Sequence, residues 1–171
     1  MRLKRTAKWI TAGAFLLGIG ILLRSCVPPS ERSVVRNFQR HKDVFERLLV
    51  MFDEDSARIS AVYPDSYRAS DKQSWRPPEE LGVSKERNAE YCRLLKHAGV
   101  RSLVRRDDET CFDIAGSGFG SHGWRLGIVH RVIQPSRIIP SLSEFTEHRL
   151  KTKVDHAYCP IEDNWYVWVI W

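Results

Sequence analysis

The sequence predicts an α+β fold, with an N-terminal membrane segment followed by two amphipathic helices packed on one face of a mainly antiparallel sheet. Three observations lead to this prediction. A cationic leader precedes an uncharged apolar run, apolar residues then recur with the helical period over residues 30–53 and 84–98, and the period changes to two after Gly99. The chain is long enough for one domain beyond the leader. We therefore expect an anchor or signal segment at 1–29 and a domain at 30–171.

The N-terminal segment has the strongest pattern in the chain. Five of the 27 basic residues lie within residues 1–24, which contain no acidic residue. Between Lys8 and Arg24, the stretch Trp9–Leu23 is fifteen residues without a charge, and Pro28 ends any helix soon afterwards. The pattern predicts contact with a membrane through residues 6–25.

Three interpretations of this segment remain open. A signal anchor makes the chain a single-pass inner-membrane protein with its C-terminal domain in the periplasm, because basic flanks stay in the cytoplasm. The run is shorter than the roughly 20 residues a span needs, but Lys8 and Arg24 can snorkel. A lipoprotein signal would anchor the chain at Cys26, although Arg24 does not suit that motif. A cleaved secretory signal lacks its small-residue cleavage site. All three export the domain.

Two helices are expected in the first half of the domain. Residues 30–53 have apolar side chains at spacings of three, four and seven, with Ser30 as the N-cap. Residues 84–98 form the second helix, which ends at Gly99. The inner face of this second helix is predicted to consist of Tyr91, Leu94, Leu95 and Ala98. Residues 57–63 can form a short strand.

Proline and glycine in residues 64–82 predict a long surface loop there. Beyond Gly99 the alternating segments predict strands. These are Val100–Arg106, Thr110–Ala115, Trp124–Ile133, Lys153–Ile161 and Asn164–Trp171. The last strand is apolar on both faces, which favours a central, covered strand over an aromatic surface for a partner.

Charge argues against binding of nucleic acid. The formal charge is +6, but removing the five cations of residues 1–24 leaves 22 basic against 21 acidic residues. A nucleic-acid-binding domain needs a basic surface on its folded part. The basicity of this chain belongs to its leader instead.

The Gly-rich segment 116–123 is the most unusual local sequence. A phosphate-binding loop would be followed by a helix N-terminus, whereas a strand is expected here. Neither Ser117 nor Ser121 has the flanking glycines of a nucleophile elbow. An inter-strand loop is favoured, and a ligand-binding loop is the alternative. In that alternative the candidate catalytic residues are Asp113 and His122.

Histidine and cysteine spacing predicts no metal site and no cofactor, since the chain has no C-x-x-C pair and no helical histidine pair. In an oxidising compartment Cys111 and Cys159, both in expected strands, are the candidate disulfide. Cys26 is the candidate lipidation site, and Cys92 has the pattern of a small buried side chain.

These observations favour a membrane-anchored, periplasm-facing module without catalytic activity, whose partner is another protein of the envelope. The alternative is a small hydrolase or ligand-binding domain that uses the Gly-rich loop 116–123.

Overall fold

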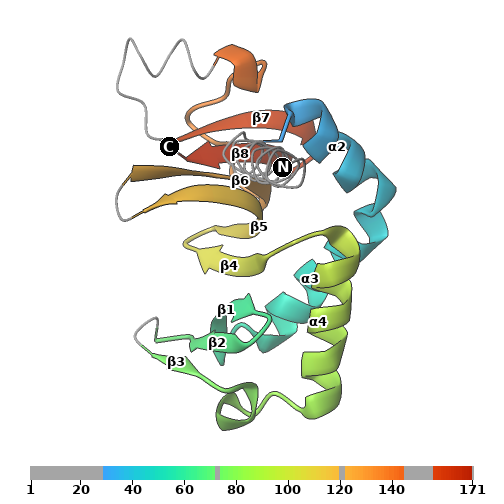
Figure 1. The fold of residues 1–171 in the computed structure, drawn as a ribbon, viewed down its shortest axis with the longest axis vertical. Coiled ribbons are helices and arrows are strands. Elements are labelled where there is room, and N and C mark those ends of the chain that lie inside the picture. The colour runs from blue at the N-terminus through green and yellow to red at the C-terminus, as the bar shows by residue number, and fades with distance from the viewer. Residues whose placement is uncertain (1–28, 72–73, 120–121, 145–155, 171) are drawn as a thin grey trace, which may run out of the picture.

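The computed structural model describes residues 29–71, 74–119, 122–144 and 156–170. Within these ranges the chain is an α+β domain (Figure 1). Its named helices are α2 (Glu31–Arg40), α3 (Lys42–Asp55), the 3-10 helix η1 (Pro78–Leu81) and α4 (Lys85–Ala98). Its strands are β1 (Ile59–Tyr63), β2 (Ser66–Ala69), β3 (Trp75–Arg76), β4 (Ser102–Arg106), β5 (Glu109–Phe119), β6 (His122–Arg131), β7 (His156–Glu162) and β8 (Trp165–Ile170).

The first predicted helix is two helices. Ser30 caps α2 as expected, since its hydroxyl accepts a hydrogen bond from the Ser33 amide. The helix then breaks at His41, whose φ of −122° and ψ of 26° lie outside the helical region. The apolar period continues across the break, with Phe38 and Phe45 both buried. For this reason the period alone could not reveal the break.

The second predicted helix is confirmed as α4. The Ser84 hydroxyl accepts a hydrogen bond from the Arg87 amide at the N-terminus, and Gly99 ends the helix with a φ of 65°. All four residues expected on the inner face are buried.

The strands form one eight-stranded sheet in the order β3-β2-β1-β4-β5-β6-β8-β7, and every neighbouring pair of these strands is antiparallel. Two of the hairpins turn at Asp107 and Asn164, which have φ values of 47° and 61°. The long surface loop predicted for residues 64–82 is wrong. That segment forms β2, β3 and η1, and Tyr67 of β2 is fully buried.

The two faces of the sheet bury different clusters. The helices lie along one side of the sheet in Figure 1, and the residues they contribute pack with alternate residues of the strands. The opposite face, called here the second face, carries a separate cluster. Its buried members are Cys111, Val129, Tyr158, Tyr166 and Trp168. Strand β8 supplies both clusters, which confirms that it is a strand buried on both faces.

The predicted membrane segment at residues 6–25 and the candidate lipidation site Cys26 lie outside the described residues. Among the residues described, no helix is both long and apolar enough to cross a membrane.

Candidate functional site

The Gly-rich segment is mostly strand. The ladder between β5 and β6 continues through Gly116 to the pair Phe119–His122, so the segment expected to be a loop is the end of a long hairpin. Gly116 permits close contact in this hairpin, because an added Cβ would lie 3.0 Å from the Trp124 carbonyl oxygen.

The candidate catalytic residues are not brought together. Asp113 pairs with Gly127, whereas His122 pairs with Phe119, five residues away along β6. Five residues of strand span roughly 16 Å. A carboxylate that orients a histidine must lie within hydrogen-bond reach, so this hairpin does not assemble the pair.

The candidate disulfide Cys111–Cys159 is not formed, and both residues are free thiols. Cys111 of β5 lies on the second face, whereas Cys159 of β7 packs in the cluster on the helix side, with β6 and β8 between their strands. Sequence alternation identified both as strand residues but could not give their faces. Burial raises the pKa of the Cys159 thiol to about 12.

A polar cluster on the second face is centred on Glu109. Its Oε2 accepts hydrogen bonds from the Tyr158 hydroxyl at 3.0 Å and from Arg131 Nη1 at 3.4 Å, and its Oε1 lies 3.5 Å from Cys111 Sγ. The Arg131 guanidinium also lies 5.8 Å from the centre of the Tyr158 ring. The expected strand began at Thr110, whereas β5 begins at Glu109, so the sequence pattern did not reveal this cluster.

The hydrogen bonds of the Glu109 cluster have a structural role. Burial, and then the Glu109 carboxylate, raise the pKa of the Cys111 thiol far above its usual value. The same two causes raise the pKa of Tyr158 to about 12. A thiol that stays protonated is a poor nucleophile. These groups therefore hold β5, β6 and β7 together.

A second polar feature crosses the second face next to this cluster. Asp113, Gly127 and Trp168 are successive cross-strand neighbours on β5, β6 and β8. Asp113 Oδ2 accepts a hydrogen bond from Ser102 at 2.8 Å. In the described part of the chain, Asp113 Oδ1 and Trp168 Nε1 are both buried without a hydrogen-bond partner. Within these described residues the indole lacks an acceptor and the carboxylate oxygen lacks a donor.

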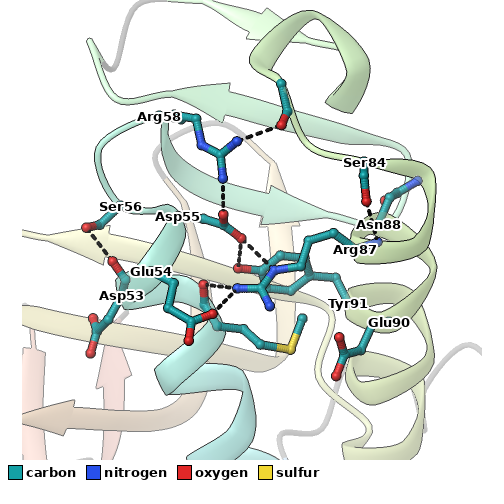
Figure 2. Close-up of polar contacts among 12 residues, drawn as sticks. Asp53, Glu54, Asp55, Ser56, Arg58, Ser84, Arg87, Asn88, Glu90 and Tyr91 are labelled. Carbon is teal, nitrogen blue, oxygen red and sulfur yellow. Dashed lines mark hydrogen bonds and ion pairs between the residues drawn. The ribbon is translucent and has the colours of Figure 1, made fainter.

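Asp55, at the C-terminus of α3, is the centre of an ion-pair network (Figure 2). Its Oδ2 accepts hydrogen bonds from Arg87 Nε at 2.8 Å and from the Tyr91 hydroxyl at 3.0 Å, and its Oδ1 accepts from Arg58. Arg87 continues to Glu54 at 2.7 Å. The network links α3 to α4 and to the start of β1.

The charge of Asp55 is stabilised by these neighbours. Burial alone would raise the pKa of this carboxyl, but hydrogen bonds from Arg87 and Tyr91 and the charges of Arg87 and Arg58 hold it below its usual value. Both carboxylate oxygens are engaged within the chain. Its geometry is that of an interhelical clamp.

Three exposed aliphatic side chains lie in the described part of the connection after β6. Val132 and Ile133 are 73% and 62% exposed, and Ile138, six residues after Val132, is 39% exposed. The strand expected to run to Ile133 ends at Arg131, so Val132 and Ile133 lie beyond β6. This segment is the candidate surface for a partner.

The described residues define an α+β domain with helices on one face of an eight-stranded antiparallel sheet, and they contain no group of three or more His, Cys, Asp or Glu that could hold a metal ion. No family model, curated protein or solved structure matches this chain.

Proposed function

We propose that this chain is a membrane-anchored, periplasm-facing interaction module of the bacterial envelope, and that its partner is another protein. The support for its location is the sequence of the leader, in which five cations flank an uncharged run of fifteen residues. The lipoprotein anchored at Cys26 is the alternative mode of attachment.

The observation that carries the interaction is the exposed aliphatic segment 132–138. Single exposed apolar residues are common on protein surfaces, but neighbouring ones mark contact sites. Val132, Ile133 and Ile138 lie within seven residues of one connection. Burial of these side chains against a partner is favourable, because each Å² of apolar surface removed from water contributes about 25 cal/mol of free energy.

Topology is tested with a reporter fused after Trp171. We expect the reporter to be active only outside the cytoplasm and the chain to sediment with membranes. Cys26→Ser should sediment in the same way, because the apolar run can anchor the chain without a lipid. Loss of membrane attachment in Cys26→Ser would favour the lipoprotein instead, and a cytoplasmic reporter in a soluble fraction would contradict the export of the domain.

The partner surface is tested with a photo-crosslinking residue in place of Gln134, which is exposed between the aliphatic side chains. In cells, this probe should give a discrete crosslink to one protein. Val132→Ser combined with Ile133→Ser should reduce that product about tenfold, which corresponds to about 1.4 kcal/mol of binding free energy. Val50→Ser is the matched control, since Val50 is 49% exposed on α3.

An unchanged crosslink in the double variant, or the same product from a probe at Ala89 on α4, would contradict the proposal. The ligand-binding alternative predicts a different result. A small molecule that raises the melting temperature of the parent, but not that of Asp113→Asn, would favour a ligand on the second face.

A further inference from the structure

The outward face of α2 carries three arginines in a row. Arg32, Arg36 and Arg40 are all exposed and recur at every fourth residue. At 3.6 residues per turn they fall within an arc of about 80° and along about 12 Å of helix. The buried side chains of α2, Val34 and Phe38, lie on the opposite side of the helix.

No acidic group of α2 balances these charges. Glu31, the only acidic residue of the helix, turns away, and its Oε2 accepts hydrogen bonds from Ser141 Oγ at 3.1 Å and the Leu142 amide at 2.7 Å. None of the three arginines makes an ion pair or a hydrogen bond with another described side chain. Lys42, at the start of α3, is by contrast paired with Glu162.

Such an arrangement is unfavourable for an isolated helix. Like charges four residues apart repel each other, whereas mixed signs at this spacing attract. A mixed pair of this kind occurs on α3, between Lys42 and Glu46. The repulsion on α2 is relieved when an external anion approaches the arginines.

The position of α2 in the chain indicates which anion this is. This step rests on the membrane attachment proposed above. Arg32 follows Arg24, at the end of the apolar run, by eight residues. A fully extended chain of that length reaches at most about 30 Å. The arginines are thereby tethered close to phospholipid headgroups.

We propose that the stripe Arg32–Arg36–Arg40 docks on anionic phospholipid headgroups of the membrane that holds the N-terminus. Guanidinium groups form paired hydrogen bonds with phosphate oxygens, and an anionic surface attracts basic side chains that lie close to it. Docking lays α2 along the membrane, which orients the domain attached to it.

The test uses the intact chain reconstituted in vesicles of phosphatidylcholine, with or without about 30% phosphatidylglycerol, a fraction at which attraction of each arginine to the surface is measurable. Modification of each arginine by phenylglyoxal is followed by mass spectrometry. We expect the three arginines to react about fivefold more slowly on the anionic vesicles, which corresponds to about 1 kcal/mol each. At about 1 M salt, where the Debye length is about 3 Å, the difference should vanish.

Arg93 on α4 is the internal control, because it is exposed and has no partner among the described residues. Its rate should not depend on the lipid. Arg36→Gln should restore faster modification of Arg32 and Arg40, while Arg93→Gln should leave their protection unchanged.

The outcomes separate this inference from the proposed function. A chain that sediments with both vesicles but shows equal modification rates overturns the lipid contact and leaves the anchor intact. A chain that sediments with neither overturns both. Protection in native membranes without protection on anionic vesicles identifies an acidic protein as the occupant and also overturns the lipid contact.

Discussion

Trp168→Ala should lower the free energy of unfolding by about 3–5 kcal/mol, the usual cost of truncating a buried aromatic side chain. Trp168 is 3% exposed and packs in the second-face cluster. The Arg106 guanidinium lies 5.2 Å from the centre of its ring. The loss is comparable to the whole stability of many domains, at about 5–15 kcal/mol.

The packing around Trp168 leaves little room for relaxation. Its indole lies over Gly127, where an added Cβ would come within 2.7 Å of Nε1 and 2.2 Å of the Phe112 carbonyl oxygen. Removing the indole therefore leaves a cavity over this face of the sheet. The strands below it are held in place by their own hydrogen bonds and cannot move to fill the space. Denaturant unfolding of the intact chain in detergent measures the effect.

Trp75→Ala is the matched control, because Trp75 is 52% exposed on the two-residue strand β3. A change at the surface should cost about 0.5 kcal/mol, so the two variants should be easily distinguished. Equal unfolding midpoints for Trp168→Ala and the parent would show that the indole adds nothing to the core. Its role would then have to lie in binding a partner.

The parts of the fold that sequence predicted correctly depend on local signals. Ser30, Ser84 and Gly99 are capping residues whose hydrogen bonds and dihedral angles are made within one helical turn. The breaks between the expected strands at residues 107–109 and 162–163 are also local, and the turns with positive φ at Asp107 and Asn164 lie within or next to them. The two-sided burial of β8 also follows from its own composition, since an apolar strand must be covered twice.

The errors arose where tertiary contacts decide the structure. Strand β2 has a single large apolar side chain, Tyr67, and forms because it pairs with β1 and packs on Tyr91 of α4. Its four residues are too few to show the apolar alternation that predicts a strand. The separation of Asp113 and His122 along the hairpin has a related cause. Proximity across a hairpin depends on register, which the position of the turn between the strands decides.

The Asp55 network shows the same limit for sites. Asp55 and Arg87 are 32 residues apart and lie on different helices, so no motif or spacing connects them. A carboxylate at the end of an amphipathic helix usually faces water. Here the packing of α3 against α4 buries it, and the structure alone reveals the arginine that compensates its charge.

Arg87→Met should therefore destabilise the domain by about 3–5 kcal/mol near pH 7, because it removes the main partner of a buried carboxylate. Methionine retains the aliphatic part of the Arg87 side chain but removes the guanidinium, whose central carbon lies 5.5 Å from the centre of the Tyr91 ring. The effect then reports mainly the lost charge and hydrogen bonds. Arg47→Met is the matched control: Arg47 pairs with Glu90 between the same helices, but its side chain is 50% exposed. An exposed pair contributes about 0–1 kcal/mol.

The pH dependence separates the electrostatic explanation from a packing defect. In the parent the pKa of Asp55 is below its unfolded value, so its contribution to stability is present above the unfolded pKa and is lost as the pH falls through the folded one. In Arg87→Met only Tyr91 and Arg58 remain to stabilise the charged carboxylate against the effect of burial, so protonation of Asp55 costs the variant less than it costs the parent. The difference in unfolding free energy between parent and variant should thus shrink as the pH falls below about 4, the usual pKa of an aspartate. A difference that stays constant down to acidic pH would show that Arg87 acts through packing alone.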